Sequence, residues 1–306
     1  MNEIVGRMID TQLLLFLYML CGVIVSRLRI IRDDNREVLV RLLMDVAMPM
    51  MVLSAFNKPT SLEEIKSSLL VIVIAAAGCL VAWALGLVLW RKSPENKRKV
   101  LLYATMFSNA GNAGLPVINL VFGPTGVFYA SMYLIPPRIL QWTVGLGFFL
   151  KPKKGAFVKN VLLNPMVVVV YIGFILMAFN WQIPGVFGTA ISRLGDMTGP
   201  LSMILIGATL SQMKPGALLD RAVLAVSALR LLILPLLAAV ALRLLQVDAM
   251  TMNICVILLA MPVASNTASI AERYGGDYVF ASACVSVSTL LSVVTVPFVT
   301  WLIQMI

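Results

Sequence analysis

Long apolar runs, separated by short polar segments, recur along the whole chain at intervals of about 30 residues. A helix needs about 20 mainly apolar residues to cross the hydrocarbon core of a bilayer, and each run is close to that length. The pattern therefore predicts an all-α integral membrane protein with ten spanning helices. Their expected ranges are 9–27, 37–56, 67–90, 100–122, 126–149, 161–180, 188–211, 218–244, 249–271 and 277–304. The turn Gly123-Pro124-Thr125-Gly126 is expected to break the chain between the fourth and fifth helices.

Two of the apolar runs are interrupted in their middle by residues that do not suit a spanning helix. The first interruption, Ser108–Pro116, contains two amides, a hydroxyl, two glycines and a proline, and the second is Met261–Thr267. Backbone without helical hydrogen bonds is very costly in lipid, so it occurs only where protein or a water-filled cavity surrounds it. We therefore expect helices four and nine to be broken at membrane depth, where transporters bind their substrates.

The two interruptions belong to a wider internal repeat. Several pairs of residues match at nearly the same separation, about 151 residues along the chain. The pairs are Asp45 with Asp196, Ala130-Ser131 with Ala281-Ser282, and Gly123 with Gly275. We therefore divide the chain into a first five-helix repeat, 1–150, and a second, 151–306. An odd number of helices in each repeat inverts the second relative to the first, and the broken helices should then cross near the midplane.

Composition and charge placement agree with a membrane protein and suggest its orientation. Of the 306 residues 60% are hydrophobic and 12% are charged, against about 25% charged in soluble domains. Most of the 24 lysines and arginines lie in the odd-numbered loops, which the positive-inside rule places in the cytoplasm. Both termini would then be extracytoplasmic, in a multi-pass protein of the cell inner membrane. We interpret the basic loops as orientation signals and expect no nucleic-acid partner.

The interruptions offer chemistry that suits a loosely held anion. Freed N–H groups at the start of a half-helix favour negative charge, and Pro116 suits the first position of one. Ser265, Asn266 and Thr267 suit the cap of the other, after Pro262. A single break could merely kink a packed helix, but two at matched positions indicate a binding site. The candidate substrate-binding residues are Asn109, Asn112, Pro116, Pro262, Ser265, Asn266 and Thr267.

Four further ionisable residues lie within the expected helices. Arg138 follows Pro136-Pro137 and either attracts an anionic substrate or pairs with an internal acid. Asp45 and Asp196 are either proton carriers or partners of a neighbouring arginine one helical turn away. Arg230 is expected to snorkel to the cytoplasmic surface. The chain has no histidine, and nothing in it indicates a cofactor or a metal site.

These motifs, taken together, resemble the auxin efflux carrier family, which includes plant PIN-type auxin carriers and bacterial malate permease-like proteins. The small size and the short central loop resemble a prokaryotic member. The resemblance covers nearly the whole chain. Its most specific pieces are Asn164-Pro165, Ile183-Pro184-Gly185, Gly199-Pro200-Leu201 with Ile206-Gly207-Ala208-Thr209-Leu210, and Met261-Pro262-Val263-Ala264-Ser265-Asn266 followed by Tyr274-Gly275-Gly276-Asp277 and Val296-Pro297.

The resemblance implies the fold of bile-acid sodium symporters, with crossed broken helices four and nine, and an elevator-type movement. Helices 1, 2, 6 and 7 would form a scaffold through which a homodimer could assemble, and helices 3–5 and 8–10 would form a moving core. Sodium-coupled relatives carry charges in helix three and a carboxylate at the second break. This chain has neither, which disfavours a sodium site of that kind and leaves proton coupling or no coupling open.

The sequence therefore predicts a secondary transporter, not an enzyme, for a small organic anion such as a dicarboxylate or an auxin-like aromatic carboxylate. One alternative is a sensor or channel that keeps the fold without carrier activity. A remote alternative is an intramembrane aspartyl hydrolase built on Asp45 and Asp196, which requires the two carboxylates to share a proton. Neither aspartate lies in the Gly-x-Gly-Asp context of membrane aspartyl proteases.

Overall fold

The protein is a bundle of helices in the computed structural model, which describes residues 2–57, 62–149, 165–179, 181–211 and 220–305. Within those ranges no strand forms, and the single β-type contact is one isolated bridge. The all-α prediction is therefore confirmed. Some of the sequence predictions fall outside the described residues. They concern the basic residues Lys151–Lys159 and Lys214, the start of the expected sixth helix, and Asn164.

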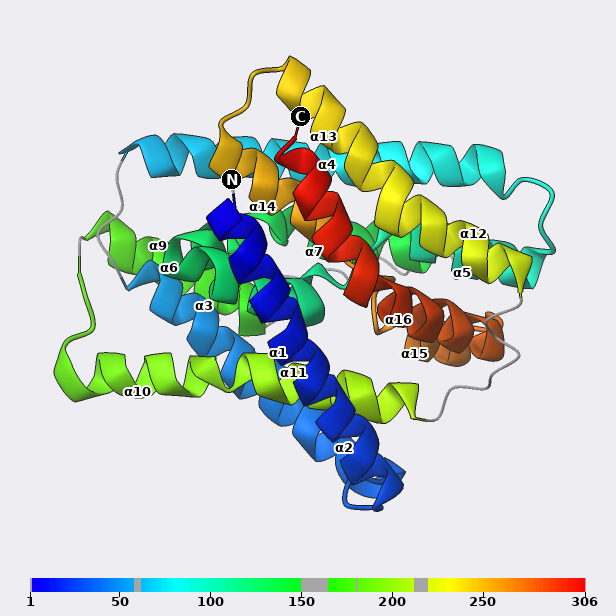
Figure 1. The fold of residues 1–306 in the computed structure, drawn as a ribbon, viewed down its shortest axis with the longest axis horizontal. Helices are drawn as coiled ribbons and strands as arrows, with labels where there is room; N and C mark the ends of the chain where they lie inside the picture. The colour runs from blue at the N-terminus through cyan, green and yellow to red at the C-terminus, as the bar shows by residue number, and fades with distance from the viewer. Residues whose placement is uncertain (1, 58–61, 150–164, 180, 212–219, 306) are drawn as a thin grey trace.

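The described residues of the first half form ten helical segments, and Figure 1 labels the α-helices among them. They are α1 (Asn2–Arg27), α2 (Asp33–Arg41), η1 (Leu42–Ala47), α3 (Met48–Phe56), α4 (Leu62–Leu89), α5 (Glu95–Met106), η2 (Ala110–Gly114), α6 (Leu115–Tyr133), α7 (Ile135–Leu140) and η3 (Gln141–Gly145). The ribbon of α6 continues across the expected turn, but Gly123 inside it has non-helical angles, φ 62° and ψ −157°. Two helices therefore meet at a kink at Gly123, where the turn predicts a break in the chain.

Nine helical segments follow in the described residues of the second half. They are α9 (Pro165–Ala178), α10 (Gly185–Asp196), α11 (Thr198–Leu210), α12 (Arg221–Ala228), η5 (Leu229–Ile233), α13 (Leu234–Leu244), α14 (Ala249–Leu259), α15 (Thr267–Arg273) and α16 (Tyr278–Ile303). Among the described residues of the whole chain, five continuous helical stretches are long and apolar enough to span a membrane, and two apolar helices are shorter. This supports a multi-pass membrane protein, whereas the ten-helix inverted repeat stays a prediction.

Three π-helical turns, η1, η2 and η5, share one cause. Each ends two residues before a proline: Pro49, Pro116 and Pro235, respectively. Proline has no N–H to donate, and its ring collides with the carbonyl group four residues earlier. A wider π turn relieves that collision without ending the helix, and such turns are frequent at functional sites. The prolines in the apolar runs therefore bend the helices locally.

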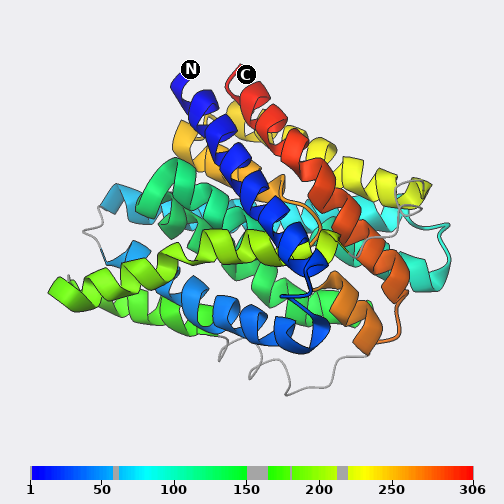
Figure 2. The ribbon, with the colours of Figure 1, turned by 60° about the horizontal axis from the view of Figure 1, so that its bottom comes forward.

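Close backbone contact fixes the crossing of α1 and α11, which lie against each other in both views (Figures 1 and 2). A Cβ atom at Gly22 would collide with the carbonyl oxygen of Ile204, and one at Gly207 with that of Met19. The small residues let the two backbones approach, as is common between membrane helices. Beyond this crossing, the hydroxyls of Ser26 and Ser211 share a 2.7 Å hydrogen bond.

The outer surface of the bundle is largely apolar. Large side chains such as Val88, Val186 and Phe187 are exposed, although soluble proteins seldom expose contiguous apolar patches of more than a few hundred Å². Two clusters of buried apolar residues fill the interior. An apolar exterior around a packed interior is the arrangement that lipid requires.

Candidate functional site

The two helix interruptions bind each other in the middle of the molecule. The backbone N–H of Asn109 donates to the carbonyl of Pro262 (2.7 Å), and that of Ala264 donates to the carbonyl of Phe107 (3.1 Å). Ser108 and Val263 form the isolated antiparallel bridge between them. Each interruption thus satisfies backbone groups that the other would leave without partners, which lipid does not allow.

Polar side chains extend this contact on one side of the bridge. The amide of Asn112 donates to the hydroxyl oxygen of Ser265 (3.0 Å), and that hydroxyl donates to the side-chain oxygen of Asn109 (3.4 Å). Asn109 directly precedes η2, Asn112 lies in η2, and Ser265 lies in the chain between α14 and α15. They form a small neutral network, so the sequence prediction that the two interruptions meet agrees with their contacts.

The other candidate residues at the interruptions have mainly structural contacts. Pro116 is the second residue of α6, one position later than expected, and is buried. Pro262 supplies the carbonyl that Asn109 binds. The hydroxyl of Thr267 is buried and donates to the carbonyl of Ala264 (2.6 Å). Asn266 occupies the cap position of α15, but its side chain makes no capping hydrogen bond. That side chain instead lines the cavity described next.

A cavity of about 740 Å³ lies beside the paired interruptions. Ligand sites in proteins span about 300–1,000 Å³ and place a few polar groups on apolar walls. The polar lining of this cavity at the interruptions is Ser108, Asn109, Asn112, Ser265 and Asn266. Arg138 also lines it, together with apolar residues such as Leu134 and Leu205. The structure therefore gathers four of the seven candidate substrate-binding residues, Asn109, Asn112, Ser265 and Asn266, around one space.

Arg138 gives this cavity a positive charge. The residue is half-buried on α7, a short helix with Pro136 in its first turn. A Cβ atom placed on Gly111 would lie 3.6 Å from Nη2 of Arg138, so the guanidinium approaches the first interruption. No ion pair neutralises it among the described residues. Of the two roles that its sequence position allowed, the geometry favours attraction of an anion.

Asp45 and Asp196 lie away from the cavity. Both are exposed at the surface of the bundle, on η1 and at the end of α10. Asp196 is 3.9 Å from Arg193, one turn away on its own helix. Arg41 pairs with Glu37 (2.6 Å) rather than with Asp45. For Asp196 the geometry therefore matches the local pairing that the sequence allowed.

Residues at the mouth of the cavity were not among the candidate site residues predicted from the sequence. Arg36, Glu37 and Glu272 line it, and Arg36 donates to the hydroxyl of Thr209 on α11 (2.5 Å). In the sequence these residues are ordinary helix-end charges, and only packing brings α2, α11 and α15 together. Gln141 of η3 also lines the cavity, and its position in an apolar run was the one signal that could have identified it.

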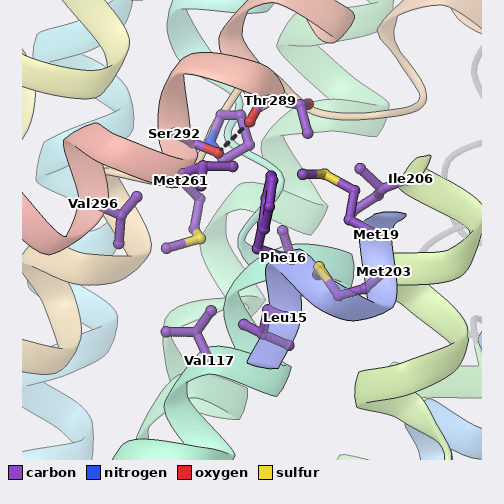
Figure 3. A pocket seen from close by; sticks show the side chains of 13 residues that line it. Leu15, Phe16, Met19, Val117, Met203, Ile206, Met261, Thr289, Ser292 and Val296 are labelled. Atoms are coloured by element: carbon purple, nitrogen blue, oxygen red, sulfur yellow. Dashed lines mark hydrogen bonds between the residues drawn. The ribbon is translucent and has the colours of Figure 1, made fainter. Parts of the chain in front are cut away.

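A second, smaller pocket of about 40 Å³ lies on the other face of the interruptions (Figure 3). Its lining is mainly apolar and comes from α1, α6, α11, α16 and the second interruption. Phe16, Met19, Met203 and Met261 point into it, with Thr289 and Ser292 above them (Figure 3). This face of the interruptions is therefore nearly filled by side chains, whereas the face with the amides is hollow.

Apolar helices that surround a polar cavity, where two broken helices meet, define a multi-pass membrane transport protein. The sequence profile described as "Membrane transport protein" matches residues 8–161 and 155–300, so the chain belongs to that family, the auxin efflux carrier family. The resemblance drawn from its motifs is thereby confirmed. Members of the family are transporters and not enzymes, which removes the hydrolase alternative.

Two curated relatives extend over nearly the full chain. An uncharacterized transporter of Methanothermobacter thermautotrophicus is 29% identical over 299 residues, which cover 94% of this chain and 96% of the relative. An uncharacterized transporter of Methanocaldococcus jannaschii is 22% identical over 306 residues, which cover 96% of this chain and 98% of the relative. Both are similar to this chain along their whole length.

Proposed function

We propose that this protein is a secondary carrier for a small organic anion, either a dicarboxylate or an aromatic carboxylate. The observation that supports the proposal is the cavity where the amides of both interruptions converge with Arg138, which forms no ion pair with any described residue. Arg138 would attract the carboxylate, and the uncharged side chains of Asn109, Asn112, Ser265 and Asn266 would hold it through hydrogen bonds. Such contacts are weak enough to release the cargo, which a carrier requires.

The cavity would face the cytoplasm in this conformation. Arg36, Glu37 and Glu272 line its mouth and adjoin the basic loops that the positive-inside rule assigns to the cytoplasm. The N-terminal end of α1 and the C-terminal end of α16 lie together, which fits two extracytoplasmic termini in an inner membrane (Figures 1 and 2). The filled pocket of Figure 3 would then close the extracytoplasmic side.

Alternating access would follow from movement of one group of helices against the other. The scaffold would comprise α1–α3 and α9–α11, and the close crossing at Gly22 and Gly207 would make it rigid. Two copies of the chain would form a homodimer through their scaffolds. The moving core would comprise α4–α7 and α12–α16, including both interruptions. Thr209 and Arg36 belong to the scaffold, whereas Arg138 belongs to the core, so such a movement would reshape the cavity.

Uptake into proteoliposomes tests this function. We expect saturable uptake of at least one of malate, succinate, benzoate and indole-3-acetate. Replacing Asn112 and Asn266 together with alanine should lower uptake at low substrate concentration about tenfold or more, because each lost hydrogen bond contributes about 1 kcal/mol. Arg138→Gln should lower it further, because it removes the charge that attracts the anion.

Gln182→Ala is the matched control for the amides, because Gln182 is exposed far from the cavity lining. It should leave uptake unchanged. Uptake that rises linearly without saturation would indicate a channel, and binding without uptake would indicate a sensor. Full uptake in the Asn112/Asn266 double variant would reject the assigned site.

A further inference from the structure

Arg230 lies in the interior of the protein, contrary to the expectation that it snorkels. The residue is 1% exposed and is among the largest fully buried side chains of the described chain. Its Nη1 donates a 2.8 Å hydrogen bond to the backbone carbonyl of Thr105. Its Nε is buried and has no partner among the described residues. Arg230 does not line the cavity.

The carbonyl that Arg230 binds is one that the first interruption leaves free. In a continuous helix the N–H of Asn109 would donate to the carbonyl of Thr105, four residues earlier. Here the N–H of Asn109 donates instead to Pro262, across the bridge to the second interruption. The guanidinium of Arg230 therefore replaces the helical hydrogen bond that Asn109 gives up when the two interruptions pair.

Local structure brings Arg230 to this position. It lies in the π turn η5, whose wider path precedes Pro235 and turns residue 230 into the bundle. Thr105 is also held through its side chain, because the indole N–H of Trp90 donates to its hydroxyl (2.9 Å). The end of α5 is thus fixed by Trp90, which directly follows α4, and by Arg230 of η5, before the chain enters the interruption.

The charge of Arg230 suits the end of α5 that it contacts. The carboxyl end of a helix carries partial negative charge, and a cation placed there is stabilised. No carboxylate pairs with Arg230 in the part of the chain that the structure describes. A buried cation with one unpaired donor costs stability, so its presence at the interruption suggests a role in shaping the site.

We propose that Arg230 is a built-in cation that caps the carbonyl end of α5 and holds the paired interruptions in their binding geometry, so that the site needs no dissolved cation to assemble. Arg230 is a positioning residue, since its contact with Asn109 and Asn112 is indirect, through the backbone. This inference rests on the proposed function in taking the interruptions as the substrate site.

Hydrogen–deuterium exchange of the purified protein tests the proposal without any substrate. In Arg230→Gln, peptides that cover 105–114 and 260–266 should exchange about tenfold faster, because a charge-assisted hydrogen bond is lost. Peptides of α1 and α11 should be unchanged. Arg230→Lys should exchange close to the wild-type rate, since an ammonium can still donate to the carbonyl of Thr105. The wild-type protein should exchange equally in sodium chloride and choline chloride.

Arg243→Gln is the matched control, because Arg243 lies exposed on α13, which continues the same helix. The proposal would be overturned if exchange in Arg230→Gln stayed at the wild-type rate. It would also be overturned if the wild-type interruptions exchanged more slowly in sodium chloride than in choline chloride. If Arg230→Gln does not fold, the exchange rates of Arg230→Lys and of the wild-type protein in the two salts still test the proposal.

Malate uptake gives a separate readout for positioning. Arg230→Gln should raise KM for malate about tenfold, with recovery in Arg230→Lys and no effect of sodium on either. A KM that stays at the wild-type value would contradict the positioning role. An absence of malate uptake in the wild-type protein would count against the proposed substrate alone, since the exchange experiment does not depend on it.

Discussion

At the scale of single residues, the cap of α12 shows how one carboxylate binds two backbone N–H groups and one lysine. Asp220 accepts hydrogen bonds from the N–H groups of Ala222 (2.8 Å) and Val223 (3.4 Å) and lies 3.3 Å from Nζ of Lys97. Partial burial alone would raise the pKa of Asp220, but the hydrogen bonds from Ala222, Lys97 and Val223 outweigh it and hold that pKa below its usual range. Asp220 thus ties the start of α12 to α5.

We expect Asp220→Ala to lower the stability of the purified protein at neutral pH by about 1 kcal/mol, the usual effect of losing a helix cap. Because the folded pKa is depressed, the contribution of Asp220 is complete above the unfolded value of about 3.9 and is lost as pH falls through the folded value. The difference in melting temperature between variant and wild type should therefore shrink from pH 7 to pH 3.

The control for this prediction is Asp10→Ala, because Asp10 is exposed in the middle of α1, where it caps no helix. Its melting temperature should follow that of the wild type at both pH values. A difference between Asp220→Ala and wild type that grows as the pH falls would contradict the assigned direction of the pKa shift.

At the scale of elements, helices are joined rigidly where their backbones lie in direct contact. The crossing of α1 and α11 depends on Gly22 and Gly207, each of which faces a carbonyl oxygen of the other helix. The interruptions of α5–α6 and α14–α15 instead meet through hydrogen bonds of backbone and amides. The first contact has no room for an added atom, whereas the second leaves a cavity beside it.

Gly22→Ala should destabilise the protein by about 2 kcal/mol, because the methyl group would force α1 away from α11. Thermal unfolding in detergent measures the effect. Gly147→Ala is the control, since a Cβ there meets no atom within 4 Å. Equal melting temperatures for Gly22→Ala and Gly147→Ala would show that the backbones do not meet as closely as described.

At the scale of the whole molecule, the two faces of the paired interruptions differ. One borders the cavity of about 740 Å³, and the other borders the pocket of about 40 Å³ shown in Figure 3. This asymmetry is what a carrier open to one side requires. We therefore expect a water-soluble reagent to reach the interruptions from a single side of the membrane.

Thiol labelling in oriented membranes measures this accessibility. With Cys21, the exposed native cysteine, replaced by serine, Gln141→Cys should react with a charged methanethiosulfonate applied from the cytoplasmic side. Ser292→Cys, in the filled pocket, should react at least about tenfold more slowly from either side, because a charged reagent does not enter an apolar, filled space. Faster reaction of Gln141→Cys from the extracytoplasmic side would contradict the orientation.

Single residues show what could be read from the sequence and what could not. The interruptions at 108–116 and 261–267 stand out because glycine, proline and amides violate the local rules of a spanning helix. Arg138 was identified as a candidate, but packing decides that no acidic side chain among the described residues pairs with it. Arg230 was misplaced, because its distance along the helix from the surface says nothing of Thr105, 125 residues earlier, which receives its hydrogen bond.

The sequence by itself determined the class of this protein, its helical composition, its family and the positions where helices break, because lipid makes each spanning segment satisfy its own backbone and so leaves a local signature. Only the tertiary structure decided which breaks bind each other, which amides line the cavity, and why Arg230 is buried. Those facts depend on contacts between segments about 125–155 residues apart, and no local pattern encodes such contacts.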